Sequence, residues 1–191
     1  LIFQYSSLSQ SQVVQQTGLK APTVFRIFSK LEEAGFIRTC KEEKGAAEGR
    51  ENERKGRRPN FYCVVPESCY AVGVDFSSLA AAVIVVDFGN KVIYRQSTEL
   101  DAGRNRDEVL GTIGKMISTA VEESGIETSS LLGIGVAAPG VVDTVTGRVL
   151  EYARIEGLSG YSIKEHYEKL FGVPVHVHNN ASVIASSAYH Y

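Results

Sequence analysis

The hydrophobic pattern of the chain changes abruptly near residue 66, and this change predicts two domains rather than one. Residues 1–66 combine short helical patterns with a long polar stretch, whereas residues 67–191 begin with three apolar, β-rich runs. A length of 191 residues is compatible with one or two domains. We therefore predict one domain at 1–66 and a second at 67–191.

The two parts also differ in charge. Residues 1–66 carry 11 Lys and Arg against 7 Asp and Glu, a net of +4, and residues 67–191 carry 9 against 15, a net of −6, which together give the −2 of the whole chain. A basic part beside an acidic part indicates a polyanionic partner for the basic part only. Chance unevenness is the alternative.

The cysteines and the hydropathy indicate the compartment. Cys40, Cys63 and Cys69 are odd in number and lack the CxxC spacing of a zinc site, so we expect reduced thiols and no metal in this chain. No apolar run is long enough to span a membrane, and no signal peptide is recognisable. We expect a cytoplasmic protein without membrane contact. Because the chain starts with Leu inside an apolar run, we also expect a fragment at that end.

Residues 8–37 show the pattern of a helix-turn-helix. Ser9 is a favourable N-cap, Gly18 suits the left-handed end of a first helix, and Pro22 suits the first turn of a second. In the second helix, apolar residues at Val24, Ile27, Phe28 and Leu31 form one stripe. Two short helices joined by a glycine-bearing turn are typical of DNA-binding modules.

The other residues of the second helix would face a DNA major groove. Arg26 is suited to pair with guanine O6 and N7. The alternative is an ordinary helical hairpin with a solvated charged face. The predicted major-groove residues are Lys20, Ala21, Thr23, Phe25, Arg26 and Lys30.

Residues 36–65 predict a β-hairpin with a long, charged tip. Strands at 36–40 and 61–65 flank a polar excursion, and residues 38–60 include eight basic and five acidic residues. Arginines on such a tip suit a narrow minor groove, and Pro59 stiffens the return. This is the pattern of a wing, although a solvated loop without contacts is the alternative. The predicted wing contacts are Arg54, Lys55, Arg57 and Arg58.

From Tyr70 onward the pattern predicts an α/β domain. Three strands are followed by a helix at about 107–124, a strand ending in Pro139-Gly140, a hairpin around 143–147, a helix at 162–171, a short strand and a final helix. Three antiparallel strands followed by alternating helix and strand are the ribonuclease-H-like layout of sugar kinases and actin.

Two sequence blocks carry a family resemblance. GIGVAAPGVVDTVTGRVL followed by GVPVHVHNNAS resembles the ROK family of repressors and sugar kinases, and GRRP after a winged helix-turn-helix resembles its repressor branch. Family members are longer, with a second lobe that often carries a structural zinc. The resemblance therefore implies that this chain is truncated at its carboxyl end and holds no cofactor itself.

The chain departs from the kinases of this family at two motifs. Where they have an Asp-x-Gly-Gly-Thr turn for ATP phosphates, this chain reads Asp75-Phe76-Ser77-Ser78-Leu79. Where they have Asn-Asp, with the Asp as general base, this chain has Asn179-Asn180. An amide accepts no proton but can hydrogen-bond a sugar hydroxyl. Capping of the following helix is an equally good role for both residues.

The resemblance implies further sugar contacts after the strand that ends near Gly140. The loop that lines the sugar in many members reads Arg154-Ile155-Glu156-Gly157-Leu158 here, so only Gly157 matches. The effector is then a charged or unusual sugar, or sugar binding is lost. His176 and His178 share one strand face, which fits surface histidines better than a metal pair. The predicted sugar contacts are Gly140, Arg154, Glu156, Gly157, Asn179 and Asn180.

The resemblance implies a sugar-responsive transcriptional repressor without enzyme activity. Its partners would be operator DNA and a carbohydrate effector, and it would act as a homodimer or homotetramer on a palindromic operator. One alternative is an active sugar kinase with an accessory DNA-binding domain. Another is a DNA-binding module whose second domain only oligomerises.

Overall fold

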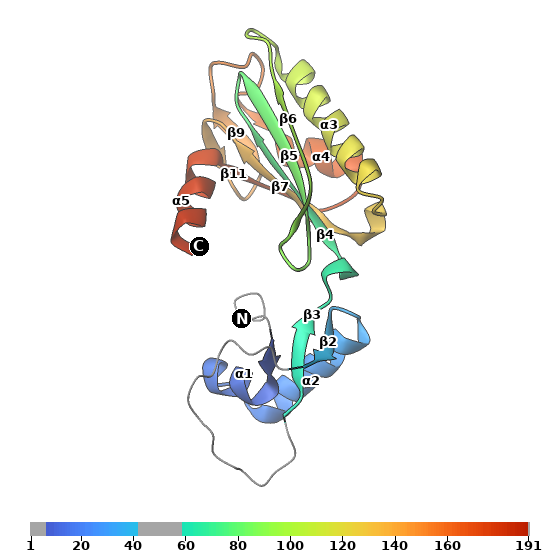
Figure 1. The fold of residues 1–191 in the computed structure, drawn as a ribbon. Helices are drawn as coiled ribbons and strands as arrows, with labels where there is room; N and C mark the ends of the chain where they lie inside the picture. The colour runs from blue at the N-terminus through green and yellow to red at the C-terminus, as the bar shows by residue number, and fades with distance from the viewer. Residues whose placement is uncertain (1–6, 42–58, 191) are drawn as a thin grey trace. The chain divides into compact units, whose positions relative to one another are not determined.

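The structure of the protein is a computed structural model that describes residues 7–41 and 59–190, with side chains to residue 185. The chain forms two compact units (Figure 1). The first contains the described residues up to Ser68 together with Phe88–Asn90, and the second contains Cys69–Asp87 and the residues from Lys91 onward.

The first unit begins with two helices that form as their capping signals predict. Helix α1 (Gln10–Thr17) starts at Ser9, whose hydroxyl accepts from the Gln12 N–H while the Gln12 side chain accepts from the Ser9 N–H. It ends at Gly18, which adopts a left-handed φ of 69°. Helix α2 (Ala21–Glu33) follows, with Pro22 in its first turn.

Three short antiparallel strands complete this unit. Strands β2 (Ile37–Cys40) and β3 (Phe61–Val64) pair as the hairpin pattern predicts, and β1 (Leu8–Ser9) adds to the other edge of β3. The sequence did not predict β1, because two residues are too few to show an alternating pattern. Val24 and Phe28 of α2 pack on Ile37 and Tyr62, with the rings of Phe28 and Tyr62 4.9 Å apart.

One residue of the predicted apolar stripe, Ile27, is exposed rather than buried. Ile27 is 42% exposed, whereas Val24 and Phe28 are buried. The sheet that covers α2 is only three short strands wide, so it buries the centre of the stripe and leaves its margin in solvent.

The second unit is built on a five-stranded mixed sheet with the order β11-β7-β4-β5-β6. Strands β4, β5 and β6 are antiparallel neighbours, and β7 and β11 run parallel to β4. The bounds are β4 Tyr70–Phe76, β5 Ala80–Asp87, β6 Val92–Glu99, β7 Leu131–Ala138 and β11 Val175–Asn179.

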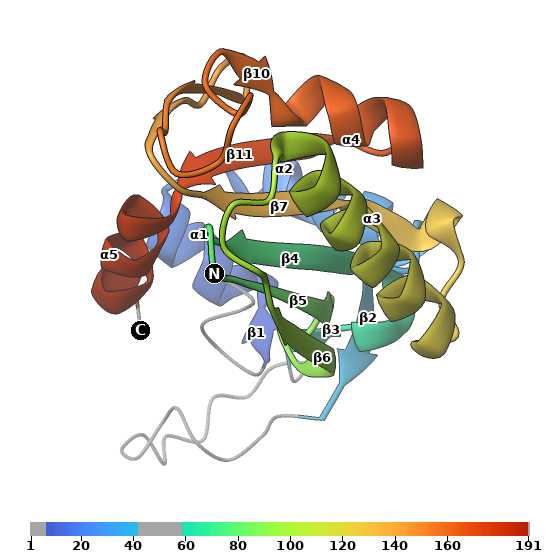
Figure 2. The same cartoon turned by 90° about the horizontal axis from the view of Figure 1, so that it is seen from above.

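Helices cover the sheet unequally. Helices α3 (Arg106–Glu123) and α4 (Ile163–Phe171) lie at one face and α5 (Asn180–His190) lies at the other (Figures 1 and 2). A small antiparallel sheet of order β10-β9-β8 follows β7. The remaining elements are β8 Val141–Asp143, β9 Arg148–Glu151, β10 Tyr161–Ser162 and the 3₁₀ turns Pro66–Ser68 and Thr128–Ser130.

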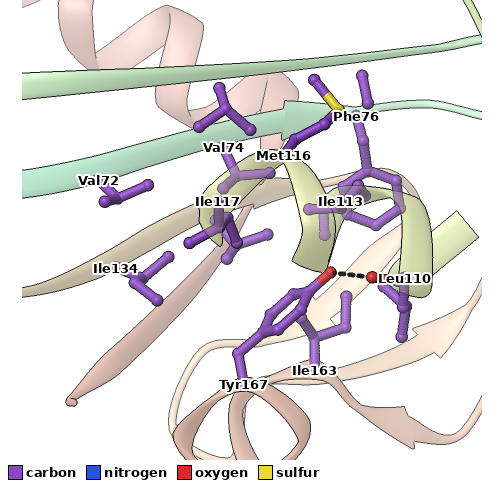
Figure 3. Close-up of a cluster of buried hydrophobic side chains, with 14 of the residues drawn as sticks. Val72, Val74, Phe76, Leu110, Ile113, Met116, Ile117, Ile134, Ile163 and Tyr167 are labelled. Atoms are coloured by element: carbon purple, nitrogen blue, oxygen red, sulfur yellow. Dashed lines mark hydrogen bonds between the residues drawn. The ribbon is translucent and has the colours of Figure 1, made fainter. Parts of the chain in front are cut away.

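The core of this unit follows the period-2 alternation of its strands. Alternate residues of β4, Val72, Val74 and Phe76, point toward Ile113, Met116 and Ile117 of α3 (Figure 3). Tyr167 of α4 is fully buried, and its hydroxyl donates to the Leu110 carbonyl of α3 at 3.0 Å. Burial raises the pKa of Tyr167, so its hydroxyl remains a donor at neutral pH. These elements form the mixed α/β layout that the sequence predicts.

Candidate functional site

One edge of the large sheet gathers the polar residues that the sequence singled out. Strands β4, β6, β7 and β11 all run in the same direction, so their carboxyl ends meet at this edge. Asp75 lies near the end of β4, Gly140 follows β7, and Asn179 closes β11. Ligands of open α/β sheets bind beyond the carboxyl ends of the strands, which makes this edge the candidate effector site.

Asn179 links the backbone that follows β7 to the first turn of α5. Its Nδ2 donates to the Gly140 carbonyl at 2.5 Å, and its Oδ1 accepts from the Ser182 N–H at 3.1 Å. The Asn180 Oδ1 accepts from the Ala181 N–H at 2.9 Å. Helix capping, one of the two roles considered for this pair, is therefore observed for both side chains.

Gly140 sits where a side chain does not fit. Its φ of +83° lies in the left-handed region, and a Cβ atom there would overlap the carbonyl oxygen of Glu151 and lie 2.9 Å from the Tyr152 Cβ. The backbone of the β7–β8 connection and the end of β9 are thus in direct contact, and Asn179 binds the carbonyl of the same glycine.

The loop 152–160 is anchored by two apolar side chains and presents its polar ones. Ile155 and Leu158 are buried in the core of the second unit. Arg154, Glu156 and Gly157 are exposed. The N–H of Arg106, at the start of α3, donates to the Glu156 carbonyl at 2.9 Å, so the loop lies beside the α3 N-terminus. The charged residues predicted to contact a sugar therefore face solvent.

The β4–β5 turn binds its own amides. The Ser77 Oγ accepts from the N–H groups of Leu79 and Ala80, both at 3.2 Å, and the Ser77 N–H donates to the Ala80 carbonyl at 2.8 Å. A phosphate-binding turn needs its amides directed outward to the anion. In this turn the N–H groups of Leu79 and Ala80 donate to the Ser77 hydroxyl oxygen instead of to an anion.

The adjoining hairpin between β8 and β9 is closed by a carboxylate. The Asp143 side chain accepts from the Thr146 hydroxyl at 2.7 Å and from the Val145 N–H at 3.0 Å. These hydrogen bonds lower the pKa of Asp143, so it is ionised at neutral pH.

The face of the sheet on which α5 lies carries a hollow of about 390 Å³. Asp75, His176 and His178 line it together with small and apolar residues, among them Gly73, Ala82 and Val183. Within residues 7–41 and 59–190, no group of three or more His, Cys, Asp or Glu side chains is placed to bind one metal ion.

The predicted DNA contacts of α2 lie on its outer face. Lys20, Ala21, Phe25, Arg26 and Lys30 are exposed and Thr23 is half-buried. Phe25 is 60% exposed, which is unusual for a large aromatic residue. Arg54, Lys55, Arg57 and Arg58 lie outside the described residues.

Sequence reasoning missed three sets of contacts that shape these sites. Ser77 was noted only as a replaced glycine, and its hydroxyl contacts depend on the turn geometry. The hydrogen bond between Asn179 and Gly140 joins residues far apart in sequence, and so does the contact of Arg106 with loop 152–160. No local pattern could reveal either contact.

No helix among the residues that the structure describes is sufficiently long and apolar to cross a membrane.

Comparison with known proteins supports the fold and the family. The chain is 22% identical over 175 residues to the xylose repressor of Caldicellulosiruptor bescii, covering 92% of this chain and 42% of that protein. It is 23% identical over 191 residues to the DNA-binding transcriptional dual regulator NagC of Escherichia coli K12, covering 100% of this chain and 45% of that protein. The chain thus spans less than half the length of these relatives.

A solved structure shares the fold. The crystal structure of a ROK family transcriptional regulator, a homologue of the E. coli MLC protein, aligns with a TM-score of 0.68 and 16% identity, covering 90% of this chain and 41% of that one. The family model of the ROK family matches residues 71–191. The second unit therefore has the mixed α/β, sugar-kinase-like fold, and the chain belongs to the ROK family.

Proposed function

We propose that this chain is part of a sugar-responsive transcriptional repressor. The first unit acts as a winged helix-turn-helix that binds operator DNA, and the second senses a carbohydrate without phosphorylating it. The observation that carries the proposal is α2, which buries Val24 and Phe28 against the hairpin while it exposes Arg26 and Lys30. The relatives named as a xylose repressor and as a DNA-binding transcriptional dual regulator support the same function.

In this proposal α2 enters the major groove and the hairpin β2–β3 acts as the wing. Helix α2 presents cationic groups for phosphates and bases, and the exposed ring of Phe25 offers an apolar contact of the kind that thymine methyl groups accept. A homodimer or homotetramer would place two such helices on half-sites of a palindromic operator, one helical turn or a multiple apart.

The site geometry favours sensing over catalysis. Asn180 replaces the general base of the kinases and caps α5, and the Ser77 hydroxyl binds the turn amides that a nucleotide phosphate would require. Sugar would instead bind at the sheet edge near Gly140, Asn179, Asn180 and the loop that carries Arg154, Glu156 and Gly157. Closure around it would shift the paired DNA-binding units.

Fluorescence anisotropy on the DNA upstream of the protein's own gene tests this function. We expect sequence-dependent binding that one member of a sugar panel releases at fixed salt, and the panel should include D-xylose, N-acetyl-D-glucosamine, phosphosugars and sugar acids. Equal binding to scrambled DNA would refute the role of α2. Tight binding that no sugar releases would refute the sensor role.

Arg26→Ala should weaken operator binding about 5- to 150-fold, the equivalent of roughly 1–3 kcal/mol, because a bidentate arginine contact to guanine is lost. The loss should disappear when the base pair it contacts is replaced. Arg104→Ala removes the same charge from an arginine that pairs with Asp101 in the second unit and should leave Kd unchanged. Normal binding by Arg26→Ala would show that α2 is not the recognition helix.

The protein should release no ADP from ATP with any sugar of the panel, and Asn180→Asp alone should restore none. The carboxylate would supply a base, but the β4–β5 turn would still lack free amides for the phosphates. A coupled assay, validated with an active sugar kinase, measures this. Sugar-dependent ADP release by the unmodified protein would establish the kinase alternative.

A further inference from the structure

The first residue of α3 holds the loop 152–160 from outside the loop. The Arg106 N–H donates to the Glu156 carbonyl at 2.9 Å, and its Nη1 donates to the Gly157 carbonyl at 3.4 Å. Its guanidinium carbon lies 4.1 Å from the centre of the Tyr161 ring, at the far end of the loop. The side chain is only 29% exposed. One arginine therefore contacts both the middle and the end of the loop.

The guanidinium is itself held in place. Its Nε and Nη2 both contact the Asp107 carboxylate at 2.8 Å, which leaves Nη1 directed at the loop. Asn105 caps α3 through the N–H groups of Asp107 and Glu108, and this fixes the residue before Arg106. The arginine is thus held at the capped start of α3 by Asp107 as well as by its contacts with the loop.

The loop is anchored on either side of its middle by two buried side chains, and a hydrogen bond of 3.3 Å from the Leu158 N–H to the Ile155 carbonyl closes the turn between them. Ile155 and Leu158 are buried, but Glu156 and Gly157 between them are exposed. Gly157 has a φ of +78°. A Cβ atom on this glycine would lie 3.8 Å from the Arg106 Cβ. The two hydrogen bonds from Arg106 are made to backbone carbonyls, so they do not depend on the side chains of Glu156 and Gly157.

We propose that Arg106 is a positioning residue that sets the conformation in which the loop presents Arg154 and Glu156, and that it thereby tunes the sugar response without touching the sugar. The positioning of the loop stands on the contacts above. The effect on the sugar response rests on the proposed function.

Amide hydrogen exchange of the full chain tests the positioning directly. The Leu158 N–H donates to the Ile155 carbonyl and the Tyr161 N–H to the Leu158 carbonyl, so both report on the loop. Arg106→Ala should raise exchange of these amides about tenfold, because a charge-assisted hydrogen bond and a cation–π contact are lost. Arg104→Ala is the matched control, since Arg104 contacts Asp101 and Thr112 and not the loop.

Conservative variants separate positioning from general destabilisation. Tyr161→Phe keeps the ring under the guanidinium and should retain most of the protection, whereas Tyr161→Leu should lose it. Exchange in β4 should stay unchanged in all four variants. Unchanged loop exchange in both Arg106→Ala and Tyr161→Leu would overturn the proposal, as would an equal rise in the Arg104→Ala control.

The sugar response distinguishes a failure of this proposal from a failure of the proposed function on which it rests. With the releasing sugar of the panel, Arg106→Ala should need about a tenfold higher concentration for half-release and should bind operator normally without sugar. An unchanged half-release concentration would overturn the tuning role. Raised loop exchange in a protein that no sugar releases from DNA would retain the positioning and refute the sensor function.

Discussion

Replacing Tyr167 with Ala should destabilise the second unit by about 3–5 kcal/mol, the cost of removing a large buried aromatic side chain. Tyr167 has no exposed surface, and its ring packs among the core residues that α3 and α4 bring to the sheet (Figure 3). Its hydroxyl also joins the two helices through the Leu110 carbonyl. Hydrogen exchange of the amides of β4 and β7 measures the change in opening free energy.

Tyr167→Phe is the control that separates packing from the hydrogen bond. It keeps the ring and loses only the 3.0 Å contact to Leu110, so it should cost about 0.5–1.5 kcal/mol. The amides of α2, in the first unit, should be unaffected by either variant. If Tyr167→Ala cost no more than Tyr167→Phe, the ring would not stabilise the contact between the helices and the sheet.

Gly140→Ala should cost roughly 2–5 kcal/mol, because two penalties combine at this position. A left-handed φ disfavours any L side chain by about 1–2 kcal/mol, and a Cβ would also overlap the Glu151 carbonyl, which adds about 1–3 kcal/mol of overpacking. Movement of this backbone would also disturb the Gly140 carbonyl, which binds Asn179 at the start of α5. Urea unfolding with exchange at the α5 and β11 amides as the local readout measures both effects.

Gly172→Ala provides the matched control for Gly140→Ala. Gly172 has a φ of +69° at the end of α4, but a Cβ there would meet no atom within 4 Å. It should therefore show the conformational cost alone, about 1–2 kcal/mol. Equal losses in the two variants would mean that the β7–β8 connection yields to the extra methyl group.

Local signals in the sequence predicted most elements of the fold. The caps at Ser9 and Gly18 act within one or two helical turns, and each lies where the pattern indicated. Helices α3 and α4 also form close to the predicted ranges. The β-rich runs from Tyr70 onward likewise indicated strands where β4, β5 and β6 form. Elements of two residues, β1 and β10, were missed because so short a segment carries no period.

The sequence by itself determined the two departures from the kinase motifs. Asn180 stands where those kinases have an acid, and Ser77 and Ser78 stand where they have glycines. Only the tertiary structure decided what these residues do instead, with Ser77 binding its own turn and Asn180 capping α5. The same holds for Arg106, whose partner Gly157 lies 51 residues away. Such contacts depend on how strands and helices pack, because packing brings together residues whose sequence neighbours give no sign of each other.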